Sequence, residues 1–358
     1  TVFQNLPTRA RKTLLCLYNR IWSSGTIPEQ CKHAMLIPIL KPNKDSSQLT
    51  SYRPISLLPC FIKILESMVK ERLEWYIEKN EILSSIQHGF RKKRSSIDNL
   101  VHLENEIQKY LFVGMKTIVV FIDLAKAYDT LWTKGLIVKL RRIGLQGNIL
   151  IFLRNYLLNR TFQVQIGNAK SAITHPENGL PQGSILSSLL FNIMISDIPL
   201  RPDIHSLIYA DDIVIWESGH DVKQNIQNIQ QYLNSLNSWL NPFGLIMSVE
   251  KTTPILFSNN TNDDNYELYI RGQKLTPHKE HKYLGVTFDK RMTWRPHLLD
   301  ISKRCKGRIN VIKSLAYAKW SGDAKELVMI YKALILSIIL STMVAKHTTR
   351  LRQAQKIC

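Results

Sequence analysis

Cysteines are few and scattered in this sequence. None of them forms a C-x-x-C pair, which argues against a zinc knuckle, and their wide spacing gives no sign of a disulfide framework. A reducing, intracellular setting is therefore expected, with nucleus and cytoplasm both open. The five cysteines of the 358-residue chain are Cys16, Cys31, Cys60, Cys305 and Cys358.

The sequence also lacks a long, unbroken hydrophobic run. Its most apolar stretch, Leu327 to Ala345, is interrupted by Lys332, and the remaining run is too short to span a bilayer comfortably. We therefore expect a buried helix there and no membrane partner. The chain starts at Thr1 with a basic, helical-looking stretch and not with a signal peptide, so it is consistent with a fragment of a longer protein.

Acidic residues are also few relative to basic ones in this sequence. Lys and Arg number 48 against 28 Asp and Glu, which gives a formal net charge of +20. Such an excess suits a polyanionic partner, and both nucleic acid and a membrane surface meet that description. The basic residues are dispersed through patterned segments and are not gathered in one tail, which favours a folded, basic groove.

The hydrophobic pattern predicts alternating helices and strands, which is typical of an α+β protein. The length predicts two or three lobes. Helices are expected over 9–23, 62–78, 96–110, 134–143, 148–158, 185–197 and 222–241, and again after residue 291. Strands are expected over 34–40, 53–58, 117–124, 162–166, 254–257 and 283–288, with a hairpin over 207–216 whose tip is Ala210-Asp211-Asp212.

Three acids stand where apolar strands end. Asp123 follows the run TIVVFI, and Asp211 and Asp212 lie at the tip of the predicted hairpin. A carboxylate in such a place loses hydration, and adjacent carboxylates repel each other, unless a cation compensates. Mg²⁺ prefers hard oxygen ligands, and two such ions support in-line displacement at phosphorus. If the two strands are neighbours, the acids predict phosphoryl or nucleotidyl transfer.

A plainer interpretation of the adjacent aspartates remains open at this point. Asp is common in tight turns because its side chain hydrogen-bonds to nearby backbone, so Asp211 and Asp212 alone do not require a metal. His278 and His281 form an H-x-x-H pattern, but no third ligand is near in sequence, and we expect them in a surface loop.

Seven ordered segments carry a family resemblance. They are SYRPISLL, QHGFRKKRSSIDNL, VVFIDLAKAYDTLW, NGLPQGSILSSLLFNIMISDIP, YADD, GLIMSVEKT and HKYLGVTFDKRMTW, and they cover roughly residues 34–297. In this order they resemble the reverse transcriptases of non-LTR (LINE-type, jockey-like) retrotransposons. The resemblance implies a right-hand polymerase fold with fingers over 1–112, a palm over 113–289 interleaved with a fingers segment at about 134–178, and a helical thumb over 290–358.

The resemblance also implies roles for individual residues. Asp123, Asp211 and Asp212 match the catalytic, metal-binding acids. The residues that match the nucleotide site are Lys41, Arg53, Tyr128, Gln182, Gly183 and Lys251, with Tyr128 as the aromatic that excludes a 2′-hydroxyl. The residues that match the template and primer contacts are Arg91, Lys92, Arg94, Tyr283, Leu284 and Gly285.

Several of these roles have simpler alternatives. Tyr128 could be a core aromatic, Arg53 could form a surface ion pair, and the basic turn that includes Arg91 and Arg94 could be only a solvated loop. A cluster of positive charge nevertheless suits template phosphates, and the planar guanidinium of Arg53 suits a triphosphate.

The expected activity is RNA-directed DNA synthesis with two Mg²⁺ ions, for which Mn²⁺ could substitute. The expected partners are a template RNA, a DNA primer and dNTPs. No endonuclease or ribonuclease H residues are evident in the sequence, so an endonuclease domain of a full element would lie outside this chain. The alternative is a decayed or domesticated relative that only binds RNA. The intact aspartates argue against it, since binding alone does not need carboxylates that repel phosphate.

Overall fold

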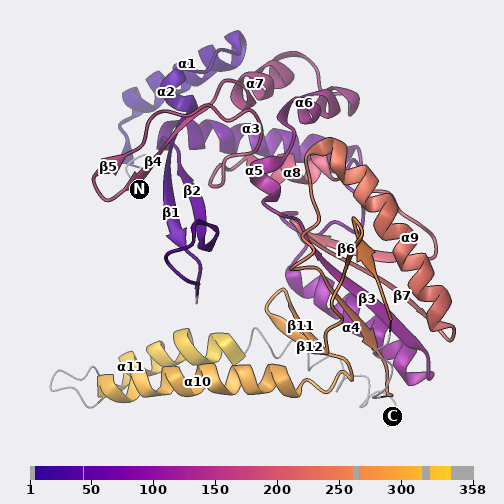
Figure 1. The fold of residues 1–358 in the computed structure, drawn as a ribbon. Coiled ribbons are helices and arrows are strands. Elements are labelled where there is room, and N and C mark those ends of the chain that lie inside the picture. The colour runs from indigo at the N-terminus through magenta and orange to yellow at the C-terminus, as the bar shows by residue number, and fades with distance from the viewer. Residues whose placement is uncertain (1–4, 43, 261–265, 317–322, 340–358) are drawn as a thin grey trace. The chain divides into compact units, whose positions relative to one another are not determined.

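A computed structural model describes residues 5–42, 44–260, 266–316 and 323–339 (Figure 1). The chain divides into two compact units, each assembled from separate segments. Unit 1 comprises Thr1–Phe90, Leu124–Pro199 and Leu236–Ile246, and unit 2 comprises Arg91–Asp123, Leu200–Ser235 and Met247–Cys358. Helices and strands occur in both units, so the α+β class predicted from the sequence is confirmed.

Unit 2 is built on a four-stranded antiparallel sheet. The strand order is β6-β7-β3-β8, so the strand earliest in the chain lies inside the sheet between two later ones. The strands are β3 (Lys116–Asp123), β6 (His205–Tyr209), β7 (Asp212–Gly219) and β8 (Thr253–Phe257). The long apolar runs of β3 and β7 follow from this position, because both faces of an inner, covered strand are buried.

Two helices cover this sheet, one on each face. Successive side chains of a strand point to opposite faces, and in β7 the residues Trp216 and Glu217 point in opposite directions. Trp216 belongs to a core cluster with Leu103 of α4 (Ser96–Phe112), whereas Glu217 accepts a hydrogen bond from Asn228 of α9 (Val222–Leu240). Figure 1 shows both helices running alongside the strands.

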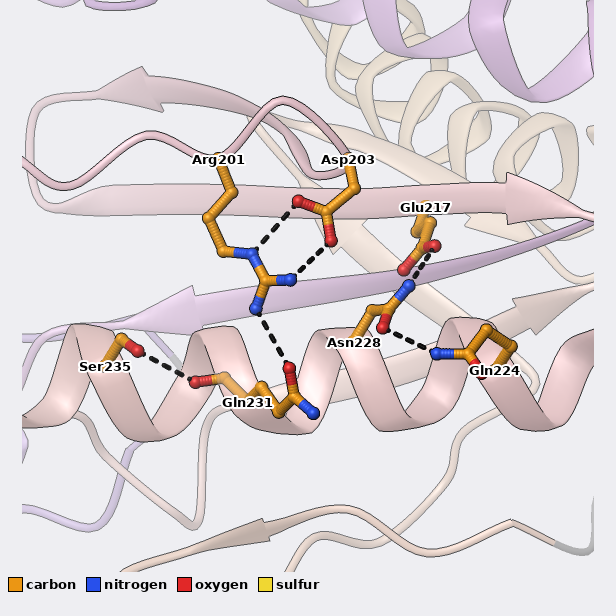
Figure 2. A network of polar contacts seen from close by, with 7 residues as sticks. All are labelled: Arg201, Asp203, Glu217, Gln224, Asn228, Gln231 and Ser235. Carbon is orange, nitrogen blue, oxygen red and sulfur yellow. Dashed lines mark hydrogen bonds and ion pairs between the residues drawn. The ribbon is translucent and has the colours of Figure 1, made fainter.

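A polar network joins α9 to the sheet and to the turn before β6 (Figure 2). The Arg201 guanidinium donates to both carboxylate oxygens of Asp203, at 3.0 and 2.6 Å, and to Gln231 of α9 at 3.3 Å. Nearby, Asn228 donates to Glu217 Oε1 at 2.8 Å and accepts from Gln224. Burial raises the pKa of Glu217, and its Oε2 has no hydrogen-bond partner.

Unit 1 contains a mixed sheet in the order β2-β1-β4-β5. The antiparallel pair β1 (His33–Leu40) and β2 (Tyr52–Leu57) forms the predicted hairpin, and β4 (Thr161–Ile166) lies parallel to β1. The short β5 (Ala169–Lys170) completes the sheet. The helices of this unit are α1 (Thr8–Ser24), α2 (Glu29–Lys32), α3 (Cys60–Lys79), α5 (Ala127–Thr130), α6 (Thr133–Arg142), α7 (Gly147–Leu157) and α8 (Ser187–Met194).

The remaining elements of unit 2 follow β8. They are β9 (Tyr269–Ile270), β10 (Gln273–Lys274), β11 (Glu280–Tyr283), β12 (Val286–Asp289), α10 (Arg295–Ala316), α11 (Ala324–Tyr331) and a π-helical turn (Lys332–Leu336). The prediction of one continuous strand over 283–288 was wrong. Leu284 and Gly285 have positive φ values of 45 and 90°, which turn the chain, and β11 and β12 form a separate two-stranded sheet.

Two helix predictions need correction. The helix expected over 185–197 is shorter, since α8 ends at Met194. The stretch Leu327–Ala345 is helical in its described part but only partly buried: Val328 and Met329 are half or more accessible, and of these described residues only Ile335 and Ile338 are buried. Residues 340–345 lie outside the described part. Among the residues that the structure describes, no helix has both the length and the apolar character needed to cross a membrane.

The network in Figure 2 predicts an asymmetry between two neighbouring residues of α9. Replacing Asn228 by Ala leaves the buried carboxyl of Glu217 without its donor, so we expect Asn228→Ala to lower the free energy of unfolding by about 1–3 kcal/mol. Gln224→Ala, at an exposed position of the same helix, should change it by less than about 0.5 kcal/mol. Urea titration followed by circular dichroism measures both, and equal losses would contradict this role of Asn228.

Candidate active site

Strand pairing brings two of the predicted acids together. In the antiparallel register of β3 and β7, Asp123 is the direct partner of Asp212, and Asp211 precedes Asp212 in the turn. Directly opposed residues in an antiparallel pair have Cβ atoms about 4.5–5.5 Å apart. Strands β3 and β7 are therefore neighbours, which is the condition for the acids to converge.

The hairpin tip that carries Asp211 is tight. Strands β6 and β7 pair up to Tyr209 and Asp212, which leaves Ala210 and Asp211 as a two-residue turn. Ala210 is buried and has a φ of 58°, in the left-handed region that a residue with a Cβ seldom adopts. The turn places Asp211 and Asp212 at consecutive positions at the end of the sheet where β3 also ends.

A lysine from the turn before β8 contacts the first acid. The Lys251 ammonium donates to Asp123 Oδ2 at 2.9 Å, and the Asp123 carbonyl accepts from Ser248 N–H at 2.8 Å. The Asp123 side chain is 27% exposed and that of Lys251 is 61% exposed, so solvent screens this ion pair. The position of Asp123 is thus fixed by its strand and by the turn at Ser248, and Lys251 supplies a compensating charge.

The acids of this cluster affect one another electrostatically. Burial, as the largest cause, and the charges of Asp211 and Asp123 together raise the pKa of Asp212 to about 6, against the opposite effect of Lys251. In the described residues no three or more His, Cys, Asp or Glu side chains are gathered closely enough to hold a metal ion. The donor set of hard oxygens and the repulsion at Asp212 nevertheless suit a divalent cation, which would remove the repulsion.

The turn between β11 and β12 holds the three residues predicted to contact the primer. Tyr283 itself is buried: its hydroxyl accepts from Asn99 of α4 at 3.1 Å, and its ring lies 5.4 Å from that of Phe121. The positive φ values at Leu284 and Gly285 turn the chain outward, and Gly285 is exposed. The Tyr283 ring is therefore part of the core, and the exposed part of this segment is the turn at Gly285.

The surface-loop prediction for the H-x-x-H pair is confirmed for His278 and wrong for His281. His278 is exposed, but His281 lies in β11 and stacks on Phe121 of β3, with ring centroids 4.4 Å apart. Burial lowers the pKa of His281 to about 4. The histidine therefore packs as a neutral aromatic against the strand that ends in Asp123.

The Gln182–Gly183 turn lies in unit 1, immediately before α8. The Gln182 carbonyl accepts from Ser56 N–H of β2 at 2.7 Å, and its side-chain amide donates to Asp129 Oδ1 at 2.9 Å. Gly183 has a φ of 123°, and a Cβ there would lie 2.6 Å from the Ser56 carbonyl oxygen. Only glycine fits at this position, which explains the residue type in the LPQG motif.

Tyr128 lies in α5, next to the same turn. Its ring stacks on Phe191 of α8 with centroids 4.9 Å apart, and its carbonyl accepts from Leu180 N–H at 2.6 Å. The side chain is half-buried. The structure thus brings Tyr128 and the Gln182–Gly183 turn together within unit 1.

Apart from Lys251, the predicted basic residues are distributed over two places. Arg53 is exposed on β2 opposite Ile39, and the Lys41 ammonium donates to the Thr50 carbonyl in the loop of the same hairpin at 2.9 Å. The other three precede α4, whose first turn is closed by a capping box between Ser95 and Asp98. That loop carries Arg91, Lys92 and Arg94, of which the last two are exposed.

Sequence reasoning missed Asp129. Its carboxylate accepts from Gln182, so it orients the side chain of a predicted nucleotide-site residue. In the sequence, Asp129 is distinguished only by its position directly after Tyr128 in the segment AYDT, and this pattern is typical of a solvent-exposed acid.

The raised pKa of Asp212 predicts a pH-dependent stability change. Because the folded value of about 6 lies above the value of about 4 for an unfolded aspartate, ionisation destabilises the fold progressively between these values and fully above pH 6. Without divalent ions, Asp212→Asn should therefore raise Tm at pH 8 by roughly 2 °C or more, and by less at pH 5.

Thermal unfolding at both pH values measures this effect. Asp300→Asn, which removes an exposed acid paired with Lys282, serves as the control and should show no such gain at pH 8. A lower Tm for Asp212→Asn than for the wild type at pH 8 would contradict the proposed repulsion.

The chain is similar in sequence to RNA-directed DNA polymerases of mobile elements. The chain is 32% identical over 323 residues to the probable RNA-directed DNA polymerase from transposon BS of Drosophila melanogaster, covering 88% of this chain and 36% of that protein. It is 27% identical over 312 residues to the RNA-directed DNA polymerase from mobile element jockey of the same species, covering 85% and 34%. The chain thus spans about a third of the length of these relatives, and the predicted resemblance to jockey-like elements is confirmed.

Solved structures resemble the fold. Apo telomerase from Candida tropicalis, truncated from its C-terminal domain, matches with a TM-score of 0.52 at 14% identity, over 78% of this chain and 59% of that one. Telomerase of the same species in complex with a fragment of telomeric RNA matches with a TM-score of 0.52 at 12% identity, over 96% and 58%. The predicted right-hand polymerase fold is confirmed.

A family model settles the relationship. The model described as reverse transcriptase (RNA-dependent DNA polymerase) matches residues 39–288, which is most of the chain and includes Asp123, Asp211 and Asp212. The protein belongs to the reverse transcriptase (RNA-dependent DNA polymerase) family.

Proposed function

We propose that this chain is the polymerase core of a non-LTR retrotransposon reverse transcriptase, which extends a DNA primer on a template RNA with dNTPs. The observation that carries the proposal is the pairing of Asp123 with Asp212 across β3 and β7, with Asp211 beside them in the turn. Three carboxylates at one end of a buried sheet repel one another, and cations shared between them would relieve this repulsion. Membership of the family supplies the reaction class.

Reverse transcriptases generally use divalent metal ions. In this chain we propose that Asp123, Asp211 and Asp212 hold two Mg²⁺ ions, for which Mn²⁺ can substitute. When bound, these ions stabilise charge on the attacking and leaving oxygens of an in-line displacement at phosphorus. The raised pKa of Asp212 means that protons compete with cations at this position below about pH 6.

Other side chains would bind and orient the substrates. Arg53 and Lys41, on one hairpin, would hold the triphosphate, Arg53 through its forked guanidinium and Lys41 through a single positive charge. Lys251 would hold a proton near the leaving pyrophosphate. Tyr128 and the Gln182–Gly183 turn would line the site for the sugar and base. Template and primer contacts would come from Arg91, Lys92, Arg94 and the turn Tyr283–Leu284–Gly285.

The division into fingers, palm and thumb remains part of this proposal. The palm would include the antiparallel sheet of unit 2, and the fingers would include the β1–β2 hairpin and α3 of unit 1. The thumb would begin after residue 290 with α10, whose exposed surface carries Lys303, Arg304 and Arg308. Such a basic helix suits contact with a nucleic-acid backbone.

Primer extension on poly(rA)/oligo(dT) tests the proposed activity. We expect Asp211→Asn to reduce dTTP incorporation by at least about a hundredfold, because a carboxylate ligand of the ions is lost. Asp300→Asn, which removes an exposed acid elsewhere in unit 2, should retain it. Equal incorporation by the wild type and Asp211→Asn would contradict the assignment. RNA binding by a wild type that extends no primer would favour the binding-only alternative.

The role of Tyr128 predicts a change in sugar selectivity. Its ring is held against Phe191, so Tyr128→Val removes volume next to the turn at Gln182 without removing a charge. We expect the preference for dTTP over UTP to fall roughly tenfold or more, because an added hydroxyl is then tolerated. Tyr128→Phe keeps the ring and should keep the preference. Steady-state extension with each nucleotide measures the ratio, and an unchanged ratio in Tyr128→Val would contradict the role.

A further inference from the structure

A buried acid lies behind the Gln182–Gly183 turn. Glu66 is on the apolar face of α3, between Leu65 and Val69, and is fully inaccessible to solvent. Its Oε2 accepts from Ile185 N–H at 2.7 Å and from the Ser184 hydroxyl at 2.9 Å. Burying a carboxyl in a core is unfavourable unless such hydrogen bonds compensate. The acid is therefore satisfied by the two residues that follow Gly183.

A tyrosine completes the network. The Tyr156 hydroxyl, from α7, lies 2.7 Å from Glu66 Oε1 and 2.7 Å from Ser184 Oγ. Tyr156 is 1% exposed, and burial raises its pKa well above the usual range, so the hydroxyl remains a donor. Arg160 donates to the Tyr156 carbonyl at 3.2 Å and lies over its ring. Groups from α3 and α7 thus converge on one side of the turn.

The other side of the turn is fixed by β2. Ser56 N–H donates to the Gln182 carbonyl at 2.7 Å, and the Ser56 carbonyl oxygen would lie only 2.6 Å from a Cβ on Gly183. The four residues Gln182–Ile185 are consequently held between a strand and a buried carboxyl. Loss of either support would remove hydrogen bonds that fix the shape of this turn.

We propose that Glu66, acting with Tyr156, is a positioning residue that holds the Gln182–Gly183 turn in the shape that accepts the incoming deoxynucleotide. The inference rests on the proposed function, since the turn is assigned there to the nucleotide site. Neither residue touches the nucleotide in this proposal. Their effect is transmitted through Ser184 and the Ile185 amide, and it acts on nucleotide binding more than on the chemical step.

The test compares three variants with a matched control. Tyr156→Phe removes one hydroxyl from the network, Glu66→Ala removes the acceptor, and Glu66→Gln retains a carbonyl acceptor for Ile185 N–H. The control is Tyr18→Phe, since Tyr18 is also buried in unit 1 but donates to the Phe61 carbonyl at 2.7 Å, away from the turn. Extension on poly(rA)/oligo(dT) gives KM for dTTP and kcat, and hydrogen exchange reports the Ile185 amide.

We expect Tyr156→Phe to raise KM about fivefold, the effect of one net hydrogen bond, with kcat within about twofold. Glu66→Ala should raise KM further and accelerate exchange of the Ile185 amide by about fivefold or more. Glu66→Gln should restore KM to within about threefold of the wild type, and Tyr18→Phe should leave it unchanged.

Two results would overturn the inference. One is a KM for Tyr156→Phe equal to that of Tyr18→Phe, and this comparison decides the matter even if Glu66→Ala does not fold. The other is unchanged exchange at Ile185 in folded Glu66→Ala. Failure of the wild type to extend any primer would instead contradict the proposed function, whereas normal wild-type extension with unchanged KM in the variants would overturn only the role of Glu66 and Tyr156.

Discussion

The antiparallel pairing of β3 with β7 is the constraint on which the site depends. It aligns Asp123 with Asp212 and makes the turn after β6 end at the same edge of the sheet. Because the side-chain period of a strand is two, a slip of one residue in this register would turn an acid into the core and leave the pair unmatched. The inner strands, covered by α4 on one face and α9 on the other, resist such a slip since nearly every side chain along them is buried.

This arrangement holds mutually repelling carboxylates close together at the end of the sheet. Asp212 is raised in pKa by burial and by its two acidic neighbours, and one oxygen of Asp123 is already compensated by Lys251. The left-handed φ of Ala210 adds backbone strain at the same place. Strain and charge repulsion are tolerated where the surrounding sheet fixes the chain, and a site that binds cations benefits because binding relieves the repulsion.

The sequence was informative where periodicity and motifs were strong. The runs around Asp123 and the YADD hairpin predicted the correct strands, and the structure supplied the pairing between them that the sequence had left as a condition. The segment 283–288 was misjudged because Leu284 is apolar, and the turn there is revealed only by its positive φ.

Glu66 was missed because its hydrogen-bond partners are distant in sequence. Without them, an acid on an apolar helix face looks like a break in the pattern. His281 was misplaced since its stacking partner Phe121 is equally remote. Long-range hydrogen bonds and ring contacts decide these cases, and local pattern does not report them.

Electron paramagnetic resonance of bound Mn²⁺ measures whether the paired acids form a metal site. With primer, template RNA and a non-hydrolysable dTTP analogue present, we expect about two tightly bound ions per chain in the wild type. Asp123→Asn, which alters the residue paired with Asp212, should lose at least one of them. Retention of both ions with wild-type affinity in Asp123→Asn would contradict the claim that the β3–β7 pairing builds the metal site.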